Sequence, residues 1–421
     1  MNVLWLCNIP TPDIASSIGQ NKQNGGGWIV SLYHLITKQE GINLYYLFPN
    51  GTAKDVKGKA KANYFGFKLK KGKPTKYNKK LEKTFKDYLT DINPDIIHVF
   101  GTEFAHHLAL TNAAKELGLE DKIIVSIQGL CSFASKHYTQ GLLRKTINSW
   151  TFRDFVRFDN IKNQQKAFKK RGAFEIKTLL NTHHIAGRTT WDKACTAQIN
   201  LSSSYHHLGE TLRENFYKNS WNIKTCKRHA IFISTAEYPI KGAHYMLRAM
   251  PQILEKFPDA HLYISGEKLD GLFSFKDKLR LSSYPKYILS LIKSLNLKNH
   301  VTFLGSLDEK RMANAFLNAH VFVSPSVIEN SPNSVGEAML MGVPVVASDV
   351  GGVSDMVTHK KDGFIYNSNA AYMLSFFVCE IFGDDNLAVA CSNNAKKHAA
   401  KTHDKESNFN DVLTLYRDII K

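Results

Sequence analysis

Residues 325–352 read PSVIENSPNSVGEAMLMGVPVVASDVGG, and this stretch decides the fold. The apolar residues just before it predict a β-strand over 320–326. A helix is predicted from Ser334 to Gly342, where the glycine ends it. The apolar residues 343–349 then predict a second strand. A strand, a helix and a strand in close succession form the unit from which helix-covered parallel sheets are built.

The same alternation of short apolar runs and helical patterns extends outward from this stretch. Further strands are predicted at residues 2–9, 42–48, 95–101, 122–129, 179–187, 229–235, 260–266 and 300–305. We therefore expect an α/β protein with two parallel-sheet domains in tandem. The N-terminal domain would span 1–208, a charged connection 209–228, and the C-terminal domain 229–402. The cleft at the carboxyl ends of their strands is the expected ligand site.

Composition supports two cores and excludes several classes. The chain has 421 residues, of which 43% are apolar and 11% aromatic, enough for more than one core. The six cysteines are scattered and form no C-x-x-C pair, so their spacing indicates neither a zinc site nor a disulfide framework. The longest apolar stretch, residues 371–382, is interrupted by Glu380, so we expect no membrane span. These features predict a cytoplasmic protein.

Two segments contribute strongly to the net charge of +18. Residues 54–86 hold thirteen lysines and two acids, a composition that favours a flexible loop. Residues 136–177 hold eleven Lys or Arg and three acids, interleaved with six Trp and Phe side chains. Such a mixture suits an anionic membrane surface or an acidic glycan, and it is also compatible with an ordinary solvated face. Nucleic acid is not expected, because no recognition helix, zinc finger or RNA-binding motif accompanies the charge.

The opening stretch also places two carboxylates around a turn. Glu329 follows the predicted strand, and Glu337 lies in the predicted helix. Ser334 and Glu337 fit the capping box S-x-x-E, in which the carboxylate folds back on its own helix start. The alternative is a ligand site, because the exposed amides of a helix N-terminus bind anions. Both interpretations remain open from the residues alone.

At these residues the chain resembles the retaining glycosyltransferases of family 4, whose C-terminal half carries the pattern P-S-x(2)-E-x(7)-E-A-x(3)-G-x-P-V-V-A-[ST]-x-x-G-G. Residues 325–352 match nearly all of it. The resemblance extends to YPIKG at 238–242, VTFLGSL at 301–307 and DGFIY at 362–366, and covers the N-terminal half only in outline. It implies the GT-B architecture: two Rossmann-like parallel-sheet domains facing a central cleft, with a final helix over 403–421 crossing back to the first domain.

The resemblance implies how a nucleotide-sugar donor would be held. Glu337 would bind the ribose hydroxyls, and Glu329 would hold hydroxyls of the transferred sugar. Lys241 would neutralise the leaving diphosphate. Backbone groups would meet the rest of the donor: the sugar or diphosphate at Asn333, Ser334 and Val335, and the base at Gly305 and Leu307. In the N-terminal domain, the glycine triplet that includes Gly26 and Gly27 would either admit a donor phosphate or acceptor, or form a mobile turn.

Two positions depart from the family pattern. Ala236 stands where the family commonly has an arginine, so one phosphate cation is missing. Ser234, Thr235 or Arg188 could replace it. Gln128 stands near the place of a histidine that touches the donor sugar. An amide can hydrogen-bond a sugar hydroxyl but cannot titrate near neutrality.

The resemblance implies a retaining enzyme of surface polysaccharide synthesis. It would move a hexose-type sugar from a nucleotide sugar, most readily a UDP-sugar, to a growing glycan or lipid-linked saccharide. Glu329, Lys241 and Gln128 are the expected catalytic residues. No metal or cofactor beyond the nucleotide sugar is expected, and a peripheral contact with an anionic membrane is expected through 136–177. Two other classes stay open: a nucleotide-sugar epimerase or hydrolase, and a binding protein without turnover, which Ala236 and Gln128 would allow.

Overall fold

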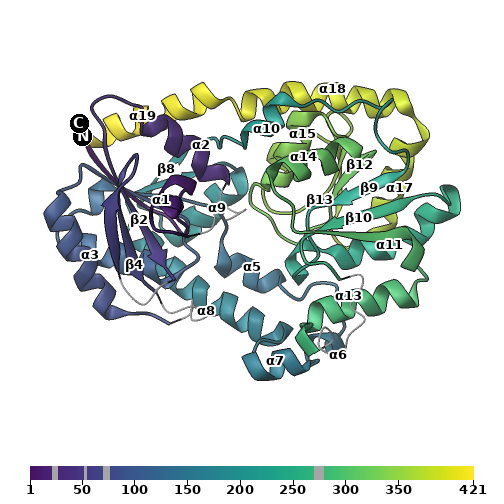
Figure 1. Ribbon diagram of the computed structural model, residues 1–421, viewed down its shortest axis with the longest axis horizontal. Helices are drawn as coiled ribbons and strands as arrows, with labels where there is room; N and C mark the ends of the chain where they lie inside the picture. Colours follow the sequence, from purple (N-terminus) through teal and green to yellow (C-terminus); the bar gives the residue numbers. More distant parts are fainter. Residues whose placement is uncertain (21–26, 52–54, 70–75, 270–278) are drawn as a thin grey trace. The chain divides into compact units, whose positions relative to one another are not determined.

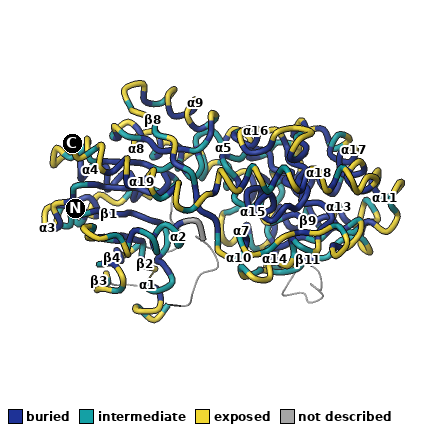
Figure 2. Tube along the Cα trace, turned by 90° about the horizontal axis from the view of Figure 1, so that it is seen from above, coloured by how far each residue is buried: buried dark blue, intermediate teal, exposed yellow. Residues whose placement is uncertain are grey.

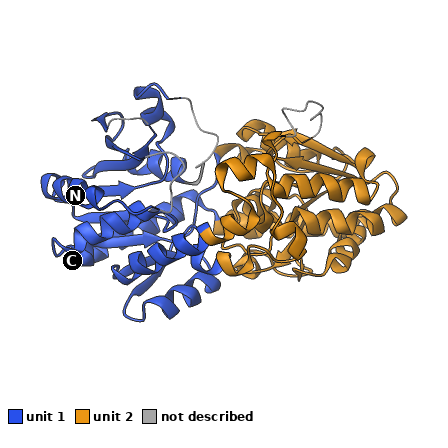
Figure 3. Ribbon diagram, turned by 90° about the horizontal axis from the view of Figure 1, so that it is seen from below, with its two compact units in different colours: residues 1–133, 167–213, 403–421 blue, residues 134–166, 214–402 orange. Residues whose placement is uncertain are grey.

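The computed structural model describes residues 1–421 except 21–26, 52–54, 70–75 and 270–278 (Figure 1). The chain divides into two compact units (Figure 3). Unit 1 contains residues 1–133, 167–213 and 403–421, and unit 2 contains residues 134–166 and 214–402. Each unit has its own sheet with helices packed around it, so the expected α/β fold with two Rossmann-like parallel-sheet domains is confirmed.

Unit 1 is built on an eight-stranded sheet in the order β3-β4-β2-β1-β5-β6-β7-β8. All neighbours are parallel except β3 and β4. The strands are β1 Asn2–Leu6, β2 Asn43–Asn50, β3 Val56–Lys59, β4 Asn63–Lys68, β5 Ile96–Phe100, β6 Ile123–Ser126, β7 His184–Gly187 and β8 Ser204–His207. Alternate side chains of β1 enter different cores, Val3 and Trp5 one of them and Leu4 and Leu6 the other.

The helices of unit 1 pack around this sheet. They are α1 Pro12–Ser17, α2 Gly27–Ile36, α3 Lys79–Ile92, α4 Ala105–Lys115, α9 Thr190–Ile199 and α19 Lys405–Ile420, with parts of α5 Cys131–His137 and α8 Ile161–Leu180. The final helix α19 belongs to this unit, where Trp5 Nε1 donates to the Tyr416 hydroxyl at 2.9 Å. His98 Nδ1 lies 2.6 Å from the same hydroxyl. The last helix of the chain therefore completes the core around the first strand.

The lysine-rich stretch 54–86 is more ordered than its composition suggests. Its described residues form β3, β4 and the start of α3, so a loop throughout was the wrong expectation. Buried aromatic residues explain the difference, because Tyr64 and Phe67 of β4 enter the cores. The lysines lie on the solvent side of a strand and helix that the apolar residues specify.

Unit 2 is built on a six-stranded sheet, parallel throughout, in the order β11-β10-β9-β12-β13-β14. The strands are β9 Ala230–Ile233, β10 His261–Ser265, β11 Val301–Gly305, β12 Val321–Ser324, β13 Val345–Asp349 and β14 Phe364–Asn367. Strands β9 and β12 are buried along their whole length, as expected for parallel strands covered on both faces. Figure 2 shows the buried residues of β1 and β9 in dark blue.

The helices of unit 2 are α6 Arg144–Ile147, α7 Phe152–Arg157, α10 Glu214–Lys218, α11 Ala243–Lys256, α13 Ser283–Ser294, α14 Glu309–Asn318, α15 Asn333–Met341, α16 Val353–Met356, α17 Ala371–Gly383 and α18 Asp385–Thr402. Among the described residues, no helix is both long and apolar enough to span a membrane. All six cysteines are free and buried.

Residues 134–166 group with unit 2, although their position in the sequence places them in the expected N-terminal domain. Contacts with α11 and α13 account for this. His244 Nε2 lies 3.2 Å from the Gln140 carbonyl oxygen, and Arg248 donates to the Gly141 carbonyl at 2.9 Å. Such contacts join residues more than a hundred positions apart, so local sequence patterns give no sign of them.

Candidate functional site

The strand order of unit 2 creates a switch point between β9 and β12. From β9 the chain runs outward through β10 and β11, and then returns to the other side of β9 with β12, β13 and β14. Connections at such a point leave in opposite directions, which opens a crevice outside the carboxyl ends of the two strands. The segments that leave β9 and β12 here are residues 234–242 and 325–332.

An ion pair joins these two segments. Lys241 Nζ lies 2.5 Å from Glu329 Oε1, and the Ser326 hydroxyl donates to the same carboxylate oxygen at 2.8 Å. The two charged side chains are 25% and 13% exposed. Burial by itself lowers the pKa of Lys241, but the Glu329 carboxylate and Tyr238 together outweigh burial and raise that pKa overall. Lys241 therefore remains a cation at neutral pH.

Two glycines allow the backbone to bring this pair together. Gly242 has φ of +67°, and a Cβ there would stand 1.7 Å from the Pro325 carbonyl oxygen. Gly351 has φ of +57°, and a Cβ there would stand 1.8 Å from the Glu329 carbonyl oxygen. Only glycine permits both the conformation and the approach. The turn before α11 and the loop after β13 therefore close directly on the Glu329 segment.

Helix α15 begins immediately after this segment, and its start rules out the capping box. The N-cap residue is Pro332, which makes no side-chain capping bond, and Ser334 is already the second helical residue. Glu337 lies in the second turn and is 5% exposed. The interpretation of Ser334 and Glu337 as a capping box was therefore wrong, because proline occupies the position that the serine would need. Glu337 is a buried carboxylate beside the switch point.

The backbone groups expected to meet the donor lie along the same edge of the sheet. Asn333 and Ser334 form the start of α15, whereas the Val335 amide already donates to the Pro332 carbonyl at 2.9 Å. Gly305 ends β11 with φ of +74°, and Leu307 follows it, half-buried. These groups and the ion pair belong to one unit and one edge.

The candidate replacements for the arginine missing at Ala236 lie in different units of the chain. Ala236 itself is buried, and Ser234 and Thr235 lie in the loop that leaves β9. Arg188, another candidate, belongs to unit 1, where it pairs with Glu210 at 2.5 Å.

The remaining candidates lie in unit 1. Gln128 follows β6 and lines a pocket at the carboxyl edge of the sheet together with Ser126, Arg188 and Glu210. Gly27 is the first residue of α2, and Gly26 lies outside the described residues. Within the described ranges, no group of three or more His, Cys, Asp or Glu residues is arranged to hold a metal ion.

Sequence reasoning assigned no role to Ser326 or Ser348. Ser326 bonds to Glu329, and the Ser348 hydroxyl donates to the Ser326 carbonyl at 2.5 Å. Both serines lie within the quoted stretch 325–352, at the ends of β12 and β13, so their place in the motif was the available signal. They fix the orientation of the carboxylate that pairs with Lys241.

Comparison with known proteins shows what the C-terminal half of the chain is similar to. Residues 213–398 match the family model of the glycosyl transferases group 1. An uncharacterized glycosyltransferase of Methanocaldococcus jannaschii is 27% identical over 202 residues, 48% of this chain and 47% of that protein. The phosphatidyl-myo-inositol mannosyltransferase of Mycolicibacterium smegmatis is 27% identical over 161 residues, 38% of this chain and 37% of that protein. The matched part spans about half, or less, of the length of these relatives.

Solved structures show the same fold over the whole chain. Anabaena HepE, solved in complex with UDP-glucose, matches with a TM-score of 0.66 at 16% sequence identity, covering 99% of each chain. At this identity the likeness concerns the fold alone. The fold is that of two-domain GT-B glycosyltransferases.

Proposed function

We propose that this protein is a retaining glycosyltransferase that moves a hexose-type sugar from a nucleotide sugar to a glycan or lipid-linked saccharide. One observation carries the proposal: the Lys241–Glu329 pair lies at the switch point of unit 2, beside the start of α15. A cation held in place next to a helix N-terminus can bind a diphosphate. A carboxylate held in place by an ion pair can accept hydrogen bonds from sugar hydroxyls. The match of residues 213–398 to glycosyl transferases group 1 supports the same class.

The donor we propose is a UDP-sugar, and the support is the likeness of fold to a protein solved with UDP-glucose. The acceptor class follows from the M. smegmatis relative, whose name specifies a phosphatidyl-myo-inositol acceptor. We place the reaction in the cytoplasm, where nucleotide sugars are made, and in the synthesis of surface polysaccharide.

In the proposed reaction, Lys241 contacts the diphosphate and stabilises the negative charge that grows on it as the bond between the sugar C1 and the phosphate oxygen breaks. The acceptor hydroxyl forms the new bond to C1 on the same face of the sugar. Its proton passes to the departing phosphate oxygen, so no protein base and no resident metal are needed. Glu329 holds sugar hydroxyls, and Glu337 binds the ribose.

The experiment is a screen of UDP-, GDP- and ADP-sugars for slow donor hydrolysis, with ligand-observed NMR to detect binding without turnover. We expect UDP-sugars to bind and to be hydrolysed slowly. Failure of every nucleotide sugar to bind would refute the proposal. An isomerised sugar would indicate an epimerase, and binding without any turnover would indicate a binding protein, the class that the buried Ala236 keeps open. An inverted linkage in a transfer product, read from NMR coupling constants, would exclude retention.

A further inference from the structure

Exposed apolar side chains concentrate in one short part of unit 2, residues 143–158. Fourteen large hydrophobic side chains are exposed in the described part of the chain, and six of them lie here: Leu143, Trp150, Phe152, Phe155, Val156 and Phe158. We call these six side chains the aromatic patch. Scattered exposed hydrophobic residues are ordinary, but a contiguous group of this density marks an interaction surface.

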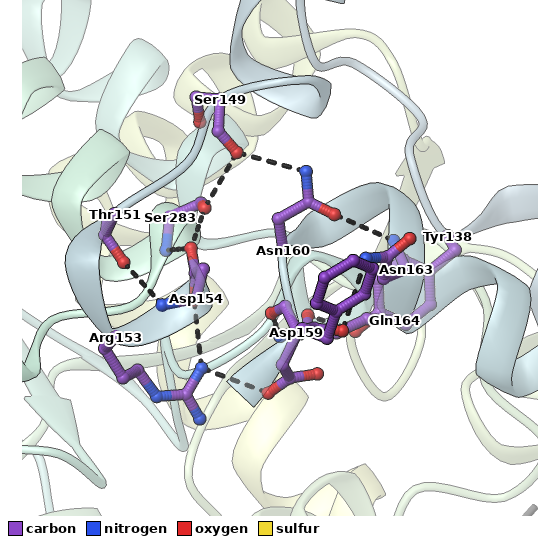
Figure 4. Close-up of polar contacts among 11 residues, drawn as sticks. Tyr138, Ser149, Thr151, Arg153, Asp154, Asp159, Asn160, Asn163, Gln164 and Ser283 are labelled. Atoms are coloured by element: carbon purple, nitrogen blue, oxygen red, sulfur yellow. Dashed lines mark hydrogen bonds and ion pairs between the residues drawn. The ribbon is translucent and has the colours of Figure 1, made fainter. Parts of the chain in front are cut away.

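Helix α7 carries the central side chains of the aromatic patch and is fixed to the rest of unit 2 by hydrogen bonds. Phe152, Phe155 and Val156 have the spacing i, i+3, i+4 and therefore share one face of the helix. The opposite face carries Asp154, which is buried and accepts hydrogen bonds from the backbone N (2.8 Å) and hydroxyl of Ser283 in α13. Figure 4 shows this network of polar contacts beneath α7. The outward-facing side chains therefore lie on a helix whose opposite face is hydrogen-bonded to α13.

Phe158 occupies a backbone position that favours glycine. It ends α7 with φ of +55°, in the left-handed region that residues with a Cβ rarely adopt. Its ring is 74% exposed and makes a T-shaped contact with Trp150, 5.6 Å between centroids. Neither backbone preference nor burial explains a phenylalanine here, so its use lies outside the fold.

Positive charge surrounds the aromatic patch. Five exposed basic side chains lie within it or next to it: Arg144, Lys145, Arg157, Lys162 and Lys166. The two acids in the sequence 134–166 do not offset them, because Asp154 is buried and Asp159 is paired with Arg153 at 3.0 Å. The surface therefore attracts an anionic partner and repels a second copy of itself.

The structure also narrows the surface that the sequence suggested. The stretch 136–177 includes Phe168 and Phe174, but both rings are partly buried in unit 1. Phe168 lies against the Arg171 guanidinium at 4.7 Å, and Phe174 lies 5.9 Å from the Tyr77 ring. Within 136–177, the exposed aromatic rings are thus confined to residues 150–158.

We propose that the aromatic patch docks this protein on an anionic lipid bilayer. The rings enter the boundary between headgroups and acyl chains, where aromatic side chains are favoured, and the surrounding cations contact lipid phosphates. The positive rim favours this occupant over a second copy of the chain. The inference does not depend on the proposed transfer reaction, because docking requires neither donor nor acceptor.

The test is co-sedimentation of the full chain with vesicles of phosphatidylcholine alone and of an equal mixture with phosphatidylglycerol. We expect binding to the mixed vesicles, weakening as salt rises because surface charges are screened. Phe152→Ser/Phe155→Ser removes two rings from the patch and should lower the partition constant by about tenfold or more. Tyr372→Ser/Phe376→Ser is the matched control, since both are exposed aromatic residues on α17 of the same unit, and it should bind like the parent.

Phe158→Gly is a second variant of the aromatic patch, chosen because glycine readily adopts the left-handed backbone conformation at this position. We expect this variant to remain folded and to bind mixed vesicles several-fold more weakly. Equal recovery with neutral and mixed vesicles would overturn the proposal, and so would unchanged binding by both patch variants. Self-association of the parent that Phe152→Ser/Phe155→Ser abolishes, without vesicle binding, would assign the patch to a second copy and overturn it as well.

Discussion

At the scale of single residues, Lys241 and Glu329 neutralise each other in the structure described. Their side chains lie 2.5 Å apart and are mostly buried, so removal of either leaves an uncompensated charge at low dielectric. A diphosphate beside Lys241 would give the ammonium a second anion and free part of the carboxylate for sugar hydroxyls. The pair therefore keeps both groups charged and positioned before the donor is bound.

Lys241→Gln should lower the rate of sugar transfer strongly, because the leaving diphosphate loses the cation beside it. Loss of one such electrostatic contact typically costs ~10²–10³ in rate. Steady-state kinetics with the identified donor would measure the effect. Lys256→Gln, which removes an exposed lysine at the end of the same helix α11, is the control and should retain parental activity. Equal activity of the two variants would show that Lys241 acts only in the ion pair.

Alanine variants of the two glutamates, Glu329 and Glu337, should differ in their affinity for the nucleoside diphosphate. Loss of a hydrogen bond to a charged group costs ~1.5–3 kcal/mol, roughly 10- to 150-fold in an equilibrium constant. Glu337→Ala should weaken binding of the free nucleoside diphosphate by about that factor, because its proposed partner is the ribose. Glu329→Ala should not weaken this affinity, because Lys241 is then free to pair with the diphosphate, and it should depress transfer, since the proposed partner of Glu329 is the sugar.

Calorimetric titration of both glutamate variants with the matching nucleoside diphosphate, beside turnover of the intact donor, measures the difference. Thermal unfolding of each variant serves as the control for folding. If Glu337→Ala binds the diphosphate like the parent, the ribose assignment must be withdrawn.

At the scale of elements, the site depends on the close approach of the backbone at Gly242 to the backbone at Pro325. Gly242→Ala should destabilise unit 2 by more than the ~1–2 kcal/mol of an unfavourable φ, because its Cβ would overlap the Pro325 carbonyl oxygen at 1.7 Å. Gly118→Ala is the matched control, with φ of +68° and open space around the Cβ, and should cost only the conformational part. Urea unfolding compares the two. Similar losses would mean that the turn can move away without harm.

Local patterns in the sequence predicted the elements that local forces determine. The strands β9, β12 and β13 and the helix α15 follow from apolar runs and from the glycine at 342, since each signal lies within a few residues of its effect. The strands β3 and β4 escaped prediction because they are short and lie in a lysine-rich stretch whose composition favours a loop. The membership of 134–166 in unit 2 escaped because it rests on contacts such as Asp154 with Ser283, 129 residues apart.

In the candidate site too, local sequence patterns predicted single residues but not the contacts between residues far apart in the sequence. The motif pointed to Glu329 and Lys241 one by one, but their pairing joins residues 88 positions apart. This ion pair forms because Gly242 and Gly351 allow two backbone segments to come into contact. Periodic patterns in the sequence do not indicate such contacts. The capping box failed for a local reason, since the S-x-x-E pattern ignored the proline that takes the N-cap position.

At the scale of the whole molecule, buried histidines link stability to pH in both units. Burial lowers the pKa of His98, His106 and His244 from 6.5 to about 3 and that of His320 to about 4. Burial also lowers the pKa of His107 well below 6.5. Three of these side chains lie in unit 1 and two in unit 2. The native state thus keeps them neutral where the unfolded chain would already be protonated.

At these histidines the unfolded state binds more protons than the native state between pH 6.5 and about 4, so they lower stability as the solution is acidified. Glu175 of unit 1 offsets part of this effect, because burial raises its pKa to about 7 and the native state then binds a proton that the unfolded state lacks. Each histidine contributes up to ~1.4 kcal/mol per pH unit, so after this offset we expect the melting temperature of unit 1 to fall by ~5 °C between pH 7.5 and 5.5. Differential scanning calorimetry across this range measures it. His98→Gln should reduce the fall, whereas His207→Gln, which replaces an exposed histidine of the same sheet, should leave it unchanged. A melting temperature that stays constant down to pH 5.5 would contradict the linkage, because it would require the buried rings to accept protons without unfolding.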